Sequence, residues 1–197
     1  MSSPPKEHQL WDACASGHLD LVESLTNDSD VNVNWIGPER GDTPLHRACR
    51  FGHSQVVKVL LKNPKVEVNA GNTGKATPFY IACQEEHHEV VSLLLANMKI
   101  NVNKPTNTGA TPFCFACRQG HKEVVTLLLA DMRIDVNKSM NDLATPFLIA
   151  CANGQKEVVS ALTGNQNRRE QTKERKSHSF LYCLPEGPER SCVTAPG

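Results

Sequence analysis

One short segment recurs at a constant interval in this chain. The segments ATPFYIAC, ATPFCFAC and ATPFLIAC begin at residues 76, 110 and 144, each 34 residues after the one before. A catalytic motif normally occurs once, whereas a motif at a fixed interval of this length is typical of a repeated structural unit. The sequence therefore predicts a stack of similar units, and any binding function must lie in the residues that differ between them.

The first half of each unit is predicted to be a short helix. In TPLHRACRFGH, Thr43 is a good helix N-cap and Pro44 suits the first helical position. The helix is expected over residues 44–50, and Gly52 ends it because glycine readily adopts the left-handed conformation that terminates helices. The same Thr-Pro pair predicts an equivalent helix in the units that follow.

The second half of each unit is predicted to be an apolar helix. Residues 54–62 carry valine and leucine around most of the helix circumference, so the helix must be covered on more than one side. An isolated unit cannot cover it, but neighbouring units can, which predicts a solenoid. Asn63, Asn97 and Asp131 are expected to end these helices, because Asn and Asp visit the left-handed region more readily than other non-glycine residues.

The segment TPLHRACRFGHSQVVKVLL, followed by VEVN, resembles the ankyrin repeat, and copies lie in register over residues 7–163. The resemblance implies an all-α solenoid of helix–turn–helix units with short β-hairpin-like fingers. The interval of 34 residues departs from the family's usual length of about 33. In that family a histidine after Thr-Pro bonds back to the threonine. Only His46 keeps it here, and the other units have Tyr80, Cys114 and Leu148.

The domain organisation follows from the ends of the repeat. One ankyrin-repeat domain is expected over residues 7–163, between a flexible N-terminus at 1–6 and a disordered basic and polar tail at 164–197. The first unit lacks Thr-Pro and carries polar residues among its apolar positions, as an N-terminal cap should. The predicted units are 7–39, 40–74, 75–108, 109–142 and, incomplete, 143–163.

A column of cysteines is expected to be structural. Small apolar side chains at one position of a stacked repeat should be buried along one line, without disulfide pairing. A histidine follows most of them four residues later, but glycines interrupt the step and successive copies stand about 8–10 Å apart. No metal site and no cofactor are therefore expected, and the histidines should bond loop carbonyls. The cysteines are Cys14, Cys49, Cys83, Cys117 and Cys151.

Composition argues against several functional classes. Lys plus Arg equals Asp plus Glu at 21 each, so the chain lacks the basic surplus of a nucleic-acid binder. Residues 1–12 do not read as a signal peptide and no apolar stretch is long enough for a membrane, so a cytoplasmic or nuclear monomer is expected. Cys114 and Cys183 lie outside the cysteine column without a marked base, and neither enzymatic activity nor a small-molecule substrate is expected.

Function is expected in the variable columns. By resemblance to the family, the fingers and the exposed side of the first helices line a concave surface that binds other proteins. The expected function is a protein-binding adaptor or recognition module. The alternatives are a fragment of a larger scaffold, such as a ubiquitin-ligase substrate adaptor, and a structural array without a dedicated partner. The fingers fall at 35–42, 72–76, 106–110 and 140–144. The candidate contact residues are Trp35, Ile36, Arg40, Asp42, Arg50, Phe51, Asn72, Lys75, Gln84, Glu85, Asn107, Arg118, Gln119, Met140, Asn141 and Asn153.

Trp35 and Ile36 lead this set because they lie in the longest finger, outside every repeated apolar column. Tryptophan and arginine are enriched at binding hot spots. The alternative is that Trp35 folds back over the first unit. Arg40, Arg50 and Arg118 are expected to offer charge-assisted contacts to an acidic partner.

The asparagines that close three units are candidate modification sites. Resemblance to the family implies that Asn69, Asn103 and Asn137, each eight residues after a leucine, are candidate substrates of an asparaginyl hydroxylase. The favoured alternative is that their side chains tie the turn backbone, which explains their recurrence without modification.

Overall fold

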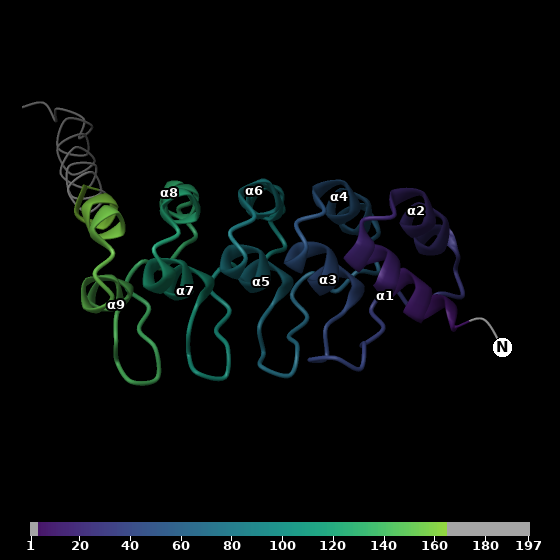
Figure 1. The fold of residues 1–197 in the computed structure, drawn as a ribbon, viewed down its shortest axis with the longest axis horizontal. Coiled ribbons are helices and arrows are strands. Elements are labelled where there is room, and N and C mark those ends of the chain that lie inside the picture. Colours follow the sequence, from purple (N-terminus) through teal and green to yellow (C-terminus); the bar gives the residue numbers. More distant parts are fainter. Residues whose placement is uncertain (1–3, 165–197) are drawn as a thin grey trace, which may run out of the picture. The chain divides into compact units, whose positions relative to one another are not determined.

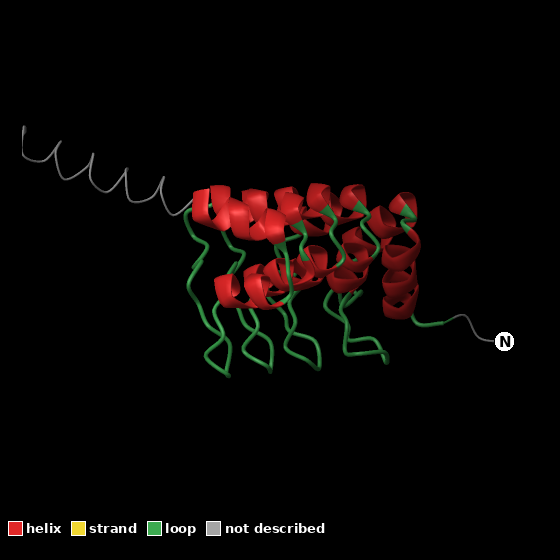
Figure 2. Cartoon of the chain, turned by 60° about the vertical axis from the view of Figure 1, so that its left-hand side comes forward, coloured by secondary structure: helices red, strands yellow, loops and turns green. Residues whose placement is uncertain are grey.

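The computed structural model describes residues 4–164, and these form two rows of helices (Figures 1 and 2). The first row contains α1 (Lys6–Ser16), α3 (Pro44–Arg50), α5 (Pro78–Gln84), α7 (Pro112–Gln119) and α9 (Pro146–Ala152). The second row contains α2 (Leu19–Asn27), α4 (Ser54–Lys62), α6 (His88–Ala96) and α8 (Lys122–Ala130), and a last helix begins at residue 156. No strand occurs within residues 4–164, so the predicted all-α solenoid is confirmed. The predicted disorder and basic run of the tail lie outside the described residues.

The Thr-Pro pairs begin the first-row helices as predicted. In α3, α5, α7 and α9 the threonine side chain accepts the backbone N–H three residues later, and proline occupies the first turn. Only α3 has a reciprocal bond, because the N–H of Thr43 donates to Nδ1 of His46 at 3.1 Å. The other units therefore keep the cap and lose the bond that histidine returns.

The second-row helices end differently from the prediction. Asn63, Asn97 and Asp131 are extended, with φ between −79° and −90°, and not left-handed. Each side-chain oxygen instead accepts the N–H two residues later, at 2.9 Å in all three units. An Asx turn of this kind satisfies a donor that follows the helix and redirects the chain without a positive φ. This local bond explains why Asn or Asp stands here.

The cysteine column is buried over most of its length. Cys14, Cys49, Cys83 and Cys117 are 0% exposed and lie in one continuous apolar core with the valines and leucines of the second row. Cys151 is exposed, which corrects the prediction for the last member. Each earlier first-row helix packs against the next one in its row, whereas among residues 4–164 no first-row helix follows α9.

Side chains at the turn between the helices link each unit to the one before it. His53, His87 and His121 place Nε2 at 2.9, 2.9 and 3.2 Å from the carbonyl oxygens of Ala15, Arg50 and Gln84. These acceptors lie in the last turn of the first-row helix of the preceding unit, and not in a loop as predicted. In the last unit the amide of Gln155 makes the equivalent bond to Arg118, at 3.1 Å.

The fingers are closed turns that are tied to one another. Within each finger a backbone N–H donates across the turn, as from Asn72 to Ala76 and from Thr106 to Ala110, both at 3.0 Å. Adjacent fingers share a further backbone bond, from Thr73 to Arg40 at 3.0 Å and likewise in the two following pairs. The fingers project from the first row, away from the second row (Figure 2).

Candidate protein-binding surface

The fingers and the first-row helices together form the surface that we call the finger face. It comprises the exposed side chains of residues 35–42, 72–76, 106–110 and 140–144, of the first-row helices, and of the residue that follows each of α3, α5, α7 and α9. Because the fingers are bonded to their neighbours, their side chains are held on a fixed backbone. A surface with this backbone can bind a partner without first ordering itself.

Aromatic rings cover the N-terminal end of the finger face. Trp35 is half-buried and meets Trp11 edge-on, with 6.3 Å between ring centroids, and His8 lies within 6 Å of both. Trp11 is buried and donates its indole N–H to the carbonyl of Asp42 at 2.8 Å. Trp35 therefore packs on the first unit, as the alternative interpretation predicted, and still shows part of its ring to solvent.

Arg47 is a residue of this surface that sequence reasoning missed. Its guanidinium carbon lies 4.0 Å from the centroid of the Trp11 ring and 5.1 Å from that of Phe51. Phe51 is 47% exposed and Ile36 is 65% exposed. The signal was present in the sequence, because the three units that follow have isoleucine or phenylalanine in the column of Arg47.

Arg50 and Asp42 are used inside the protein. Arg50 donates two bonds to the buried carboxylate of Asp42, at 2.9 and 3.2 Å, and one to Glu85 at 3.3 Å. Asn72 donates to the same carboxylate, and Gln84 donates to Glu85. These five residues therefore form a network between units. Burial of Asp42 corrects its assignment to the contact set, and the charge of Arg50 is already neutralised.

Some of the remaining candidates have exposed side chains, and others have side chains that pack against or hydrogen-bond to the protein itself. Arg40, Lys75, Arg118 and Gln119 are exposed, and Arg118 lies 5.4 Å from the ring of Phe115. Met140 is half-buried against the small apolar cluster that contains Tyr80 and Ala110. Among the candidate residues, three donate a side-chain N–H to a backbone carbonyl on this face, namely Asn107, Asn141 and Asn153.

Three fingers hold a side chain in a conformation that normally requires glycine, and in the first of them Arg40 has φ of 55°. Lys75 and Leu143 have φ of 59° and 65°, at the position where Gly41 and Gly109 stand in the other fingers. A side chain costs free energy in the left-handed region and is retained where the surroundings impose it, often at functional sites. Leu143 is 79% exposed, which adds an apolar side chain that the sequence did not single out.

The closing asparagines bridge adjacent units. Asn69 donates to the carbonyl of Lys99 at 2.7 Å and accepts the N–H of Asn101 at 2.7 Å. Asn103 makes the same pair of bonds with the next unit. Their side chains therefore tie the backbone of the following unit, as the favoured alternative predicted. Asn137 is exposed.

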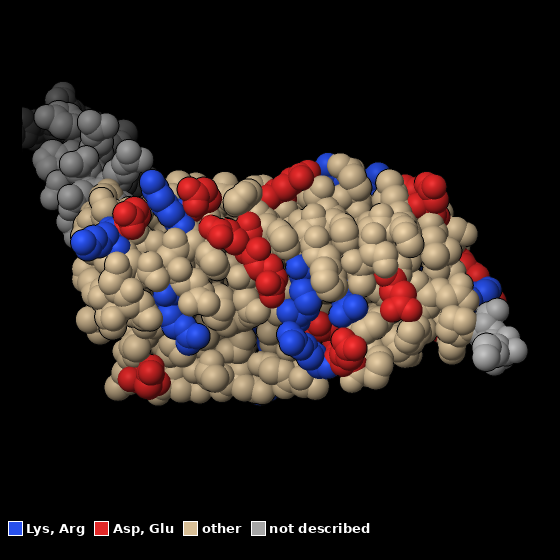
Figure 3. All heavy atoms as spheres, in the orientation of Figure 1, with Lys and Arg blue, Asp and Glu red and all other residues tan. Residues whose placement is uncertain are grey.

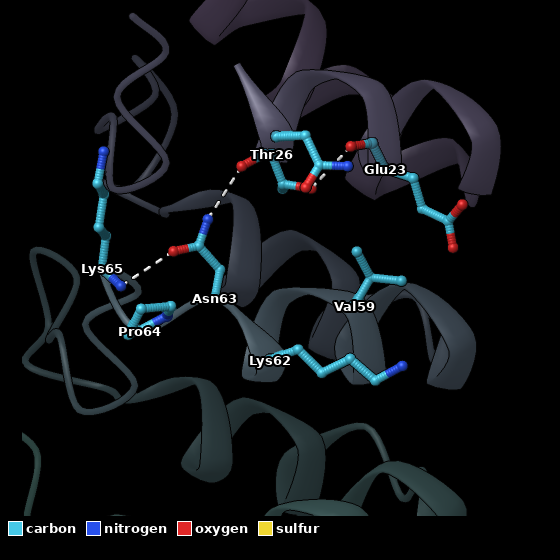
Figure 4. Close-up of a pocket in the computed structure, with 8 residues that line it drawn as sticks. Glu23, Thr26, Val59, Lys62, Asn63, Pro64 and Lys65 are labelled. Atoms are coloured by element: carbon cyan, nitrogen blue, oxygen red, sulfur yellow. Dashed lines mark hydrogen bonds between the residues drawn. The ribbon is translucent and has the colours of Figure 1, made fainter. Parts of the chain in front are cut away.

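The second row carries shallow grooves between its helix ends. One groove of about 450 Å³ lies between α2 and α4, and Figure 4 shows Asn63 reaching across it to the carbonyl of Thr26 at 3.1 Å. Another, of about 580 Å³, lies between α6 and α8, where Arg133 donates to the carbonyl of Leu95 at 2.6 Å. These bonds give both sites a structural role in joining second-row helices.

The described residues show no cluster of side chains suited to a metal ion. Among residues 4–164, no group of three or more His, Cys, Asp or Glu side chains is placed to hold a metal ion. Cys114 is buried, and burial raises the pKa of its thiol. On the face shown in Figure 3, acidic and basic side chains are interspersed. No helix of the described part is long and apolar enough to cross a membrane.

Comparison with known proteins identifies the family. A model of ankyrin repeats in three copies matches residues 10–106, 65–140 and 99–173, which together cover most of the chain. The chain belongs to the ankyrin-repeat family, whose repeats are generally protein–protein interaction modules and typically non-enzymatic.

Two curated proteins match parts of the repeat. Alpha-latrotoxin-Lh1a of Latrodectus hasselti is 41% identical over 64 residues, which are 32% of this chain and 4% of the toxin. Serine/threonine-protein kinase TNNI3K of Mus musculus is 43% identical over 51 residues, which are 25% of this chain and 6% of the kinase. The chain therefore spans a small fraction of the length of these relatives.

Proposed function

We propose that this chain is a non-enzymatic recognition module, an adaptor that binds a protein partner on its finger face. The observation that carries the proposal is the exposure of large apolar side chains on that face, at positions that differ from unit to unit. Ile36, Phe51, Leu143 and Leu148 are between 47% and 79% exposed. Burial of such side chains against a partner is the main favourable term in association.

The residues proposed to contact the partner are those whose side chains on the finger face are exposed or partly exposed. They are Trp35, Ile36, Arg40, Arg47, Phe51, Lys75, Arg118, Gln119, Leu143 and Leu148. The tied residues Asp42, Arg50, Asn72, Asn107 and Asn141 would instead position this surface. We further propose a monomer in the cytoplasm or nucleus, which light scattering of the purified chain and imaging of a fluorescent fusion would test.

The test compares two exposed apolar pairs in the full chain. The Ile36→Ser/Phe51→Ser variant changes the finger face, whereas Met98→Ser/Met132→Ser changes exposed side chains beside the second row. A tagged chain is used to recover proteins from cell lysate, and mass spectrometry quantifies them. A partner bound by the wild type and by the methionine variant should be lost with the finger-face variant. Equal recovery by all three forms would contradict the proposal.

A further inference from the structure

Arg47 is held in an unusual setting on the finger face. The Trp11 and Phe51 rings lie 4.0 and 5.1 Å from its guanidinium carbon, and its side chain is 16% exposed. A guanidinium that stacks on aromatic faces keeps its N–H donors in one plane, directed outward at its edge. Arg47 is thus an oriented and largely desolvated cation.

The donors of Arg47 are incompletely used within the described residues. Its Nε is buried and has no hydrogen-bond partner there. The carboxylate of Glu39 lies 3.7 Å from a terminal nitrogen, which exceeds hydrogen-bond distance, and Glu39 is itself highly exposed. Arg50, in the same helix, differs because Asp42 and Glu85 already receive its donors. Arg47 therefore has terminal N–H groups for a ligand, and Arg50 does not.

The surroundings of Arg47 specify more than charge. Phe51 flanks the guanidinium with an exposed ring, and Ile36 extends from the same finger as Glu39. A planar guanidinium binds a carboxylate through two parallel bonds, and such a pair is stronger where water is excluded. An acidic side chain next to a large apolar one would satisfy both features.

We propose that Arg47 receives a carboxylate from an Asp or Glu side chain of the partner, and that the adjacent residue of the partner packs on Phe51 and Ile36. This inference rests on the proposed function and defines the chemistry of the partner segment. A peptide fits better than a nucleic acid, because the chain has no net charge and Glu39 stands beside the site.

Glu39 gives the proposal a second, opposite expectation. Its exposed carboxylate is the closest acidic group to Arg47 and would have to move aside when a partner carboxylate binds. Replacing Glu39 with Gln removes the competing charge and its repulsion of the ligand. Arg47→Gln should therefore weaken binding, while Glu39→Gln should strengthen it.

The experiment uses a random peptide library displayed on phage, with the full-length chain as bait. Peptides retained by the wild type and rejected by Arg47→Gln are sequenced, and Asp or Glu next to an aromatic or large aliphatic residue should be enriched. One such peptide is then synthesised with its acidic residue and with the corresponding amide. Its dissociation constant should rise about tenfold on either change, and little further when both are combined.

Matched variants separate the specific contact from general electrostatics. Lys122→Gln removes one positive charge from an exposed position of α8, in the second row and outside the finger face, and should change the dissociation constant less than about twofold. Arg47→Lys should bind as poorly as Arg47→Gln, because lysine lacks the planar pair of donors. Circular dichroism confirms that each variant folds. Glu39→Gln, at an exposed position, tests the proposal even if substitutions of Arg47 destabilise the chain.

Different failures have different meanings. Peptides that bind without acidic enrichment, equal losses in Arg47→Gln and Lys122→Gln, or weaker binding by Glu39→Gln would overturn the carboxylate assignment while leaving a protein-binding surface. Binding of a single-stranded oligonucleotide at this site in place of peptides would also overturn it. Peptide binding that survives Ile36→Ser/Phe51→Ser, or no selected peptide at all, would count against the proposed function itself.

Discussion

Glu86 stands at a position where the other units have glycine. It has φ of 59° where Gly52 and Gly120 have left-handed values, and its carboxylate lies 3.2 Å from Nδ1 of His121 on a partly exposed surface. A β-carbon is strained there, and an exposed ion pair contributes little. Glu86→Gly should raise the free energy of unfolding by about 1 kcal/mol in urea titrations. Glu89→Gly, inside α6, should lower it by a similar amount, and a less stable Glu86→Gly would contradict this account.

His46 gives the stability a dependence on pH. Its Nδ1 accepts the N–H of Thr43, so the proton lies on Nε2, which donates to Ala76 at 2.9 Å. Burial lowers the pKa of His46 below its ordinary value of about 6.5. Between that lowered pKa and 6.5 the unfolded chain binds a proton that the folded chain does not. The contribution of His46 to the free energy of unfolding is therefore constant above pH 6.5 and becomes unfavourable as pH falls below 6.5.

His46→Leu should lose this contribution, because leucine stands in the same column of the last unit as Leu148. The variant will be less stable at neutral pH, since the reciprocal cap is lost. Its further loss of unfolding free energy between about pH 7 and pH 5 should be smaller than that of the wild type. Urea titrations across this range measure both slopes, and parallel curves would contradict the prediction.

Some features of single residues could be predicted from the sequence and others could not. The caps at Thr43 and its equivalents followed from local chemistry and were predicted. The stacking of Arg47 on Trp11 and the burial of Asp42 depend on contacts between units, which cannot be predicted from the residues next to them in the sequence. The prediction of a left-handed conformation at residues such as Asn63 was wrong, because a side-chain bond to the next turn competes with that conformation.

The elements are joined by a charged network as well as by apolar packing. Arg50 in α3 connects Asp42 in the preceding finger with Glu85 after α5. Removal of one partner from a buried ion pair leaves the other charge without compensation. Arg50→Ala should therefore lower the free energy of unfolding by about 3 kcal/mol, as measured in urea.

The matched control for this network is Arg118→Ala. Arg118 stands in the same column of a later unit, but its side chain is exposed and, among the contacts described above, lies against the ring of Phe115 alone. Its replacement should cost less than about 1 kcal/mol. Equal stabilities of the two variants would show that Arg50 is a surface residue, available to a partner as the sequence suggested.

At the scale of the whole repeat array, each unit is stabilised by its neighbours, so the end of the described array differs from its middle. Cys83 and Cys117 are fully buried, and burial raises the pKa of both thiols, whereas Cys151 in the last unit is exposed. Because the residue is cysteine at all three positions, the sequence did not predict this difference in burial. The contrast arises only from what is stacked on each unit.

This contrast predicts an order of thiol reactivity, because the thiolate is the reactive form and burial disfavours it while also blocking access. In native buffer, maleimide should label Cys151 rapidly, and should label Cys83 and Cys117 only as the array unfolds. Peptide mass spectrometry resolves the sites, and labelling in urea provides the control for full access. If Cys83 reacted as fast as Cys151 without denaturant, the buried line of cysteines, and with it the stacking that orients the finger face, would be wrong.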